Sequence, residues 1–239
     1  MNSVTRSTSY AAQWPRPGAA RLGAALAVLV ALAAVFSAHA AGPAQLVQDI
    51  NTNLNPGPSS FPSEFETIGA VTYFAATDSS HGSELWKTDG TAAGTLLVRD
   101  INPGFDGSTP QNLTKVGGTL YFTADDGTAG RELWKSDGTS AGTTLVKDIS
   151  PGASSGFGFF AAPDLTDVNG TLYFVADDGL KGAELWKSDG TAAGTVLVKD
   201  IVPGSGSAFP SQLTNVDGTL FFVATTLSAG QELWKSNGT

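Results

Sequence analysis

The feature that most constrains this fold is a four-residue motif, Glu-Leu-Trp-Lys, that recurs at nearly constant spacing. It occurs at positions 84–87, 132–135, 184–187 and 232–235, so successive copies are 48, 52 and 48 residues apart. A repeat period of roughly 20–50 residues is typical of proteins in which one supersecondary unit stacks on copies of itself. The chain is therefore expected to contain about four copies of a single structural unit.

Each copy contains four short apolar phrases separated by turn signals. In the second copy the phrases lie at 113–116, 119–124, 131–135 and 143–149. The pairs Gly117-Gly118, Asn169-Gly170 and Asp217-Gly218 are two-residue hairpin signals, because these residues tolerate the positive φ angles of a tight hairpin turn. Four short antiparallel strands in a unit of about 48 residues match one blade of a β-propeller.

Several strands are expected to be covered on both faces. The phrases at 172–176 and 196–198 are almost continuously apolar instead of alternating with polar residues. A sheet that is apolar on both faces must be buried on both faces, as a propeller blade is by its two neighbours. We therefore predict an all-β fold, a β-propeller of about four blades with four antiparallel strands each, whose units span approximately 51–101, 102–149, 150–201 and 202–239.

The fourth unit is divided between the two ends of the sequence. The phrase Leu46-Val-Gln-Asp-Ile50 matches the fourth-strand phrase Leu145-Val-Lys-Asp-Ile149, and the sequence stops at 236–239, where another such strand would be due. An N-terminal strand that completes the last blade removes an exposed sheet edge. We predict that strand 46–50 closes the ring; the alternative is an open fragment of a larger propeller.

The third-to-fourth-strand hairpin also permits a prediction of register. When the third and fourth strands are paired across the 137–142 loop, apolar residues lie opposite apolar ones and acids lie opposite bases. A shift of one residue would remove both matches, so this register is favoured. The repeated glutamate is then a cross-strand partner. The predicted pairs are Ser136–Thr143, Trp134–Leu145, Leu133–Val146, Glu132–Lys147, Arg131–Asp148, Glu84–Arg99, Glu184–Lys199 and Glu232–Gln48.

The first 40 residues have a different composition from the rest. They contain Arg6, Arg16 and Arg21, no acidic residue, an apolar run at 22–36 and the small-residue sequence Ala38-His39-Ala40. A basic region, a short apolar region and such a cleavage site indicate a secretory signal peptide. The alternative is an uncleaved membrane anchor, although 15 apolar residues are short for a span of about 20. The mature domain is expected to span 41–239 without a membrane-spanning segment, in a secreted, cell-surface or periplasmic protein.

Charge and cysteine content restrict the partners. The leader contains three of the 13 basic residues and none of the 22 acidic ones, so its removal changes the net charge from −9 to −12. This charge repels phosphate backbones and argues against nucleic-acid binding. Cysteine is absent, so the fold has no disulfides and depends on burial for its stability.

The repeated motifs resemble those of a known family. The pattern ELWKSDGTxxGTxLVKDIxPG is similar to the units of bacterial secreted ELWxxDGTxxGT-repeat proteins, often called hyalin-like and expected to be propellers. The resemblance covers residues 45–239 and implies an extracellular or cell-surface protein without naming a reaction. The first and fourth copies depart from the pattern, since 78–80 and 225–227 replace the acidic turns at 125–127 and 177–179.

Catalysis is not expected. After the leader the chain has a single histidine, His81, and no thiol, and it contains no nucleophile elbow, phosphate loop or zinc-protease motif. His81 is interpreted as an exposed loop residue. Carboxylates are numerous and could form a glycosidase-type catalytic pair. Hydrolysis is therefore kept as the less favoured alternative. However, these acids recur with the repeat, whereas a catalytic pair would form one asymmetric site.

Two groups of residues are candidates for binding. The acidic turns offer oxygen ligands that suit Ca²⁺, although turn formation is the simpler role, and each repeated tryptophan is either a sugar platform or an inter-blade core residue. The candidate metal ligands are Asp125, Asp126, Asp177 and Asp178; the candidate ligand-binding residues are Trp86, Trp134, Trp186 and Trp234. The predicted function is a non-enzymatic interaction module for an extracellular protein or glycan. The alternative is a lectin-like or calcium-dependent glycan binder.

Overall fold

The computed structural model describes residues 44–52, 59–158 and 163–238, and its residues Gln45–Thr239 form one compact unit. The predicted signal peptide and its cleavage site lie outside the described residues. The described part contains 15 β-strands arranged in four antiparallel sheets. It contains no helix long and apolar enough to cross a membrane. The prediction of an all-β repeat fold is therefore confirmed.

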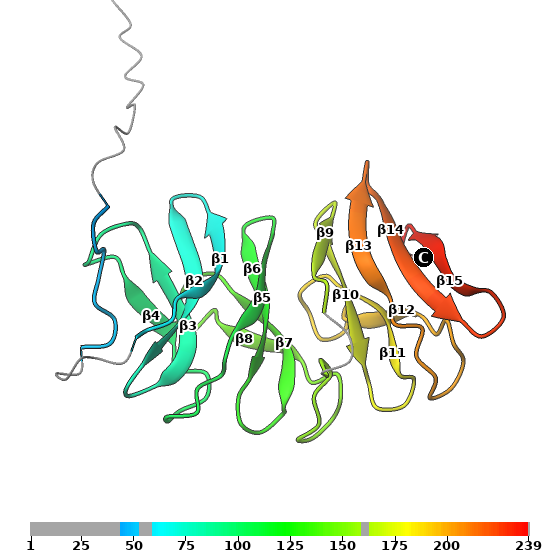
Figure 1. Ribbon diagram of the computed structural model, residues 1–239, viewed down its shortest axis with the longest axis horizontal. Helices are drawn as coiled ribbons and strands as arrows, with labels where there is room; N and C mark the ends of the chain where they lie inside the picture. The colour runs from blue at the N-terminus through cyan, green and yellow to red at the C-terminus, as the bar shows by residue number, and fades with distance from the viewer. Residues whose placement is uncertain (1–43, 53–58, 159–162, 239) are drawn as a thin grey trace, which may run out of the picture. The chain divides into compact units, whose positions relative to one another are not determined.

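The four sheets follow one another along the chain (Figure 1), and within each sheet the strands pair in sequence order. The first sheet contains β1 (Ser63–Ile68), β2 (Val71–Asp78), β3 (Gly82–Thr88) and β4 (Leu96–Arg99). The second contains β5 (Gln111–Val116), β6 (Thr119–Asp125), β7 (Arg131–Ser136) and β8 (Thr144–Lys147). The third contains β9 (Thr166–Val168), β10 (Thr171–Asp177), β11 (Ala183–Ser188) and β12 (Val196–Lys199), and the fourth contains β13 (Ser211–Val216), β14 (Thr219–Thr226) and β15 (Gly230–Ser236).

The core lies between successive sheets, as in a propeller. Alternate residues of β10 contribute to two different clusters, because successive side chains of a strand point to opposite faces. Leu172 and Phe174 pack with residues of the second sheet, whereas Tyr173 and Val175 pack with residues of the fourth. A third cluster joins the first and second sheets. The prediction of burial on both faces is confirmed for 172–176 but is wrong for 196–198, where Val196 is exposed and its two neighbours are only partly buried. The fold is β-propeller-like.

Closure of a ring by residues 46–50 is not shown. In the described part these residues form no strand, the fourth sheet has three strands, and β15 pairs only with β14. Ile50 instead packs against Phe74 and Trp86 of the first sheet. The closing strand therefore stays a prediction.

The predicted register of the third-to-fourth-strand hairpin is correct only next to its loop. Trp134 pairs with Leu145, and the Ser136 and Thr143 hydroxyls are 2.7 Å apart. A β-bulge follows, so Lys147 lies opposite Leu133 and not opposite Glu132. The same shift places Arg99 opposite Leu85 and Lys199 opposite Leu185.

The bulge changes the partners of the glutamate and the lysine. Leu145 and Val146 pack in different clusters on the two faces of the sheet, as successive residues of a strand do, so their packing does not require the bulge. The predicted pairing of Glu132 with Lys147 is wrong. Lys147 Nζ instead donates to the Thr195 carbonyl, 2.8 Å away, and lies 5.7 Å from the ring centre of Trp186.

Candidate functional site

The repeated glutamate of the third strand is buried and holds the segment that leads to the next sheet. Glu84, Glu132 and Glu184 are 0% exposed. The carboxylate of Glu132 accepts hydrogen bonds from the backbone N–H groups of Ile149, Ser150 and Gly156, at 2.9, 3.2 and 2.7 Å. Backbone N–H groups that are buried without an acceptor would destabilise the fold. The glutamate therefore has a structural role that the sequence analysis missed.

The other copies repeat this arrangement. Glu84 accepts from the backbone of Asn102 and Ser108, and Glu184 accepts from the backbone of Ile201, Val202 and Ala208. In each of the first three sheets the more distant partner follows the glutamate by 24 residues. Because every pair of residues within the repeat keeps a constant separation, this spacing alone could not identify the contact.

Burial alters the acidity of these side chains. Removal from water raises the pKa of Glu132 to about 7, and the backbone hydrogen bonds oppose the rise. Burial also raises the pKa values of Glu84 and Glu184. Because each carboxyl is directed toward backbone N–H groups and is closed off from solvent, it is not placed to transfer a proton to a bound substrate.

The four aspartates considered as calcium ligands lie where the second strand of a sheet ends. Asp125 and Asp177 are the last residues of β6 and β10, and Asp126 and Asp178 are the first residues of the turns that follow. Asp126 Oδ1 accepts from the backbone N–H groups of Thr128 and Ala129 at 2.9 and 2.8 Å. The Asp178 carboxylate makes the equivalent contacts, and Asp125 and Asp177 each accept from the glycine two residues later. These are the contacts of turn-forming aspartates. No three acidic or histidine side chains of the described residues form a group that could hold a metal ion.

The repeated tryptophans are core residues, and two of them lie between sheets. Trp134 and Trp186 are 4% and 5% exposed and belong to the inter-sheet clusters. Trp86 is 9% exposed and packs with Phe74 and Ile50 on the outward face of the first sheet. Trp234 is partly buried at the edge of the fourth sheet and stacks on Phe222. With so little exposed area, the first three indoles have no free face on which a sugar ring could stack. Their positions favour the core role over the sugar-platform role.

His81 lies in the second-to-third-strand turn of the first sheet. Its Nδ1 is 2.8 Å from Asp78 Oδ2, and this hydrogen bond raises the pKa of the imidazole. Asp78 Oδ1 also accepts from the backbone of Ser80 and His81. The histidine thus extends the turn-forming contacts of Asp78.

A face rich in exposed apolar side chains is the strongest candidate for a binding surface. We call it the link face. It consists of the turns between the second and third strands, residues 79–82, 126–130, 178–182 and 227–230. It also includes the segment that enters the first sheet, 59–62, and the segments that link each sheet to the next, 101–110, 149–158 and 201–210. These turns and linking segments lie together, as shown by the backbone bridge between Ser83 and Gly107 and by the 3.0 Å hydrogen bond from Ala183 N to Ser207 Oγ. In Figure 1 the β6–β7 and β10–β11 turns are on this side, opposite the β5–β6 and β9–β10 turns.

Five large apolar side chains are exposed on the link face. They are Phe61 (72%), Phe105 (83%), Leu180 (74%), Phe209 (47%) and Leu227 (100%). Phe209 also borders a cavity of about 130 Å³ between the second-to-third-strand turn and the linking segments, together with Phe157 and Ser207. On the opposite face the exposed apolar side chains Leu96, Val196 and Val216 are smaller or better covered. The sequence analysis missed this surface because its residues lie outside the shared repeat pattern.

A second set of residues that the sequence analysis missed lies at the start of the first strand of each sheet, in β1, β5 and β13 and just before β9. Glu64, Asn112, Asp164 and Gln212 all have positive φ angles, between 51° and 58°, which are uncommon for residues other than glycine. Glu64 Oε2 accepts from the backbone of Asn112 at 2.7 Å, and Asp164 Oδ2 accepts from the backbone of Leu213 at 2.8 Å. In the sequence, each of these positions is marked by a polar residue one or two places after a proline. The side chains of Glu64 and Asp164 connect the first strands of neighbouring or nearby sheets.

Comparisons with known proteins give only distant structural matches. No protein-family model and no curated protein match the chain. A puromycin hydrolase, solved as an S511A mutant complexed with PGG, is 18% identical with a TM-score of 0.49 over 74% of this chain and 27% of its own. The computationally designed Ika4 protein is 13% identical with a TM-score of 0.42 over 80% of this chain and 98% of its own.

An α-L-arabinofuranosidase from Clostridium thermocellum is 14% identical, with a TM-score of 0.31 over 71% of this chain and 62% of its own. The chain thus spans about a quarter of the puromycin hydrolase that it matches. At these identities and TM-scores, the matches assign neither a reaction nor a ligand to this chain.

Proposed function

We propose that this protein is a non-enzymatic interaction module that binds an extracellular protein or glycan through its link face. The observation that carries the proposal is the exposure of Phe61, Phe105 and Phe209 on that face. Exposed aromatic side chains are enriched in protein interfaces, where they provide much of the binding energy. The adjacent cavity beside Phe209 would accept a small apolar group of the partner.

The use of the acidic side chains supports the non-enzymatic part of the proposal. The repeated glutamates are directed to backbone N–H groups, and the turn aspartates stabilise their own loops. A glycosidase requires two carboxyl groups about 5–10 Å apart that face a common substrate. The contacts of these recurring acidic residues are with their own backbone, which supports a role in folding.

The compartment and the complete architecture are part of the same proposal. The leader at 1–40 and the resemblance to hyalin-like repeat proteins support secretion or display at the cell surface. We also propose that the sheets belong to a closed propeller ring. The support for this proposal is the position of Ile50, which packs on the first sheet. The equivalent isoleucine after each complete sheet packs on the sheet that follows it: Ile101 on the second, Ile149 on the third and Ile201 on the fourth.

A binding experiment with two matched triple variants tests the link face. The purified chain would be applied to arrays of glycans and of extracellular proteins, together with F61S/F105S/F209S and the opposite-face control L96S/V196S/V216S. We expect binding to persist in the control and to fall at least about tenfold in the link-face variant, with unchanged thermal unfolding. Equal binding by both variants would reject the link face.

The same arrays separate the alternative function from the main one. A lectin-like, calcium-dependent module would bind glycans and lose that binding in EDTA. Binding to a protein that is unaffected by EDTA would favour the main proposal. Turnover of a bound glycan, detected by mass spectrometry as a shortened product, would contradict the non-enzymatic assignment.

A further inference from the structure

Arg131 interrupts the repeat pattern at the edge of the link face. It is the first residue of β7 and directly follows the link-face turn 126–130. The equivalent positions in the first, third and fourth sheets are Ser83, Ala183 and Gln231. A cation that occurs in one sheet of the four is not needed to build the shared strands and turns, so its role lies outside the repeat architecture.

The guanidinium group of Arg131 is held in place through one of its nitrogens. Nη1 donates to the carbonyl oxygens of Thr109 and Thr123, at 2.9 and 3.2 Å, and lies 3.3 Å from the Thr123 hydroxyl. Thr109 belongs to the linking segment 101–110, so the side chain extends from β7 past β6 to the link face. Nε and Nη2 donate no hydrogen bond to any described residue. The orientation of the planar group is thus fixed while two of its nitrogens keep free donors.

Arg131 is partly buried and has no anionic partner among the described residues. Asp125 faces it across the β6–β7 hairpin, but Asp125 Oδ1 accepts from the backbone of Gly127 instead. Burial lowers the pKa of Arg131, and the charge of Asp125 opposes this shift; the guanidinium stays charged at neutral pH. A partly desolvated cation without a counter-ion is unfavourable. Binding of an anion at this position would therefore stabilise it.

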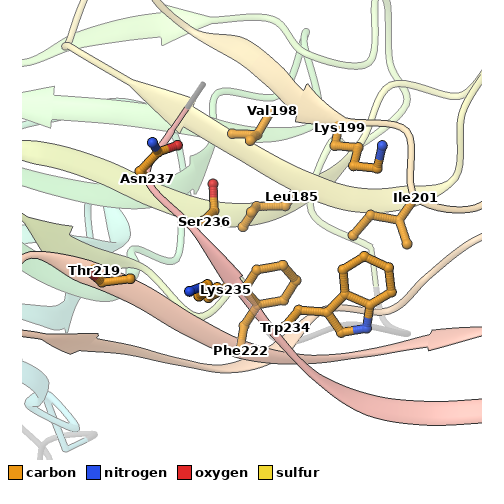
Figure 2. A pocket seen from close by; sticks show the side chains of 10 residues that line it. All are labelled: Leu185, Val198, Lys199, Ile201, Thr219, Phe222, Trp234, Lys235, Ser236 and Asn237. Carbon is orange, nitrogen blue, oxygen red and sulfur yellow. The ribbon is translucent and has the colours of Figure 1, made fainter.

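Other cations of the described part are engaged elsewhere or lie outside the link face. Lys181 pairs with Asp200 at 3.6 Å. Lys199 and Lys235 border a separate cavity of about 480 Å³ beside Trp234 (Figure 2) and are not link-face residues. Four more lysines donate to backbone carbonyls of the next repeat, namely Lys87, Lys135, Lys147 and Lys187. Arginine also presents parallel donors that match a carboxylate, whereas lysine presents a single compact charge.

An apolar cavity lies along the linking segment that contacts Arg131. Arg131 N donates to Ser155 Oγ at 3.0 Å, and Phe157 N donates to Arg131 O at 3.4 Å. Phe157 and the glycines on both sides of it also line the cavity of about 130 Å³ beside Phe209. The charged residue of this lining is Asp177, which would repel a carboxylate. The cavity therefore suits a small uncharged apolar group, and Arg131 suits an anionic one.

We propose that the partner of the link face is a protein segment that carries a carboxylate and, within a few residues, a small aliphatic side chain. The Arg131 guanidinium binds the carboxylate, and the cavity beside Phe209 receives the aliphatic side chain. This inference rests on the proposed binding function of the link face and specifies the chemistry of its partner. A polypeptide carries both groups close together. An acidic polysaccharide supplies carboxylates without aliphatic side chains, so the observations favour a protein.

Selection from a displayed library of random short peptides tests the carboxylate contact. The purified parent chain would be compared with Arg131→Gln and with Lys181→Gln, which removes another link-face cation. We expect the parent and Lys181→Gln to enrich aspartate or glutamate close to valine, isoleucine or leucine. Arg131→Gln should lose the acidic preference and keep the aliphatic one, because the cavity is unchanged. A parent selection without acidic enrichment would overturn the proposal.

Affinity measurements with one selected peptide give the size of the effect. Replacement of its acidic residue by the corresponding amide should weaken binding to the parent at least about tenfold, because hydrogen bonds to charged groups contribute more than neutral ones. In Arg131→Gln the same replacement should change the Kd by less than about twofold. The fourth sheet has Gln231 at this position, so thermal unfolding of the variant should stay close to that of the parent. An amide peptide that binds the parent as tightly as the acidic one contradicts the role of Arg131.

Two further comparisons separate this inference from the link-face proposal and from a glycan partner. If F61S/F105S/F209S loses peptide binding while Arg131→Gln keeps the acidic preference, the link face stands and the carboxylate contact is wrong. If the triple variant binds the peptide as the parent does, the link face is wrong as well. Oligogalacturonate is the acidic glycan probe. Tighter binding of this probe than of any selected peptide, lost in Arg131→Gln, would overturn the assignment of a protein partner.

Discussion

The second and fourth sheets have almost the same third strand but different surroundings. Residues 132–136 and 232–236 are identical in sequence, and both strands pair with their second strands in the same register. Nevertheless Leu133 is 0% exposed and Leu233 is 71% exposed. The difference arises from what lies beside each strand: β8 and the third sheet cover β7, whereas β15 has neither type of neighbour in the described part. Identical sequences are therefore expected to contribute unequally to stability, and paired substitutions of the tryptophan, the leucine and the glutamate test this comparison.

The largest difference is expected for tryptophan. Trp134→Ala removes a buried indole from the inter-sheet core and should lower the free energy of unfolding by about 3–5 kcal/mol. Trp234→Ala removes a partly buried indole beside a cavity, so its cost should be about half as large. Urea denaturation of both variants at a dilute, matched concentration measures the difference. Equal losses would show that the two sheets are equally packed.

Leucine should show the next largest contrast. Leu133→Ala creates a cavity in a closed core and is expected to cost about 2–5 kcal/mol. Leu233→Ala removes an exposed side chain, and in dilute protein the change should stay within about 0.5 kcal/mol. Thermal and urea unfolding of both variants would reveal it. A large loss in the Leu233 variant at low concentration would mean that this edge is covered within a single chain.

Substitution of the repeated glutamate compares its buried hydrogen bonds in the second sheet with its exposed position in the fourth. Glu132→Gln replaces one acceptor oxygen with a donor that faces backbone N–H groups, and at pH 5 it should cost about 1–3 kcal/mol. Glu232 is exposed and accepts no such backbone hydrogen bond from the described residues, so Glu232→Gln should leave stability unchanged. The measurement is urea denaturation at pH 5.

The pH dependence of the same variant provides a second readout. The pKa of Glu132 is raised in the folded state to about 7, so its contribution to stability is present below its unfolded pKa and is lost as pH rises through about 7. The cost of Glu132→Gln should therefore shrink between pH 5 and pH 8. A cost that grows with pH would indicate a carboxylate that its hydrogen bonds keep charged.

The smallest effect is expected at His81, where the second sheet has Ala129. The hydrogen bond to Asp78 raises the pKa of His81, so its stabilising contribution is present at low pH and is lost as pH rises through the folded pKa. Because the pair is partly exposed, His81→Ala should cost less than about 1 kcal/mol at pH 5.5 and still less at pH 8. Thermal unfolding at the two pH values checks the sign.

Much of the fold could be predicted because it depends on local patterns. The repeated Trp134 and its counterparts identified the period, and pairs such as Asn169-Gly170 located the hairpins, where both residues have positive φ. The apolar phrase at 172–176 predicted burial on both faces. The bulge opposite Leu133 could not be predicted, because the register without a bulge already placed apolar residues opposite apolar ones and Glu132 opposite Lys147.

The sequence by itself determined the repeat period, the all-β class and the position of nearly every strand, because turn chemistry and side-chain alternation act over a few residues. Only the tertiary structure decided what each repeated residue does. It placed Glu132 against backbone N–H groups 17, 18 and 24 residues away. It also buried Trp134 and Trp186 between sheets and left β15 and the link-face phenylalanines exposed. These outcomes depend on which sheet lies next to which strand, and identical motifs contain no information about their neighbours.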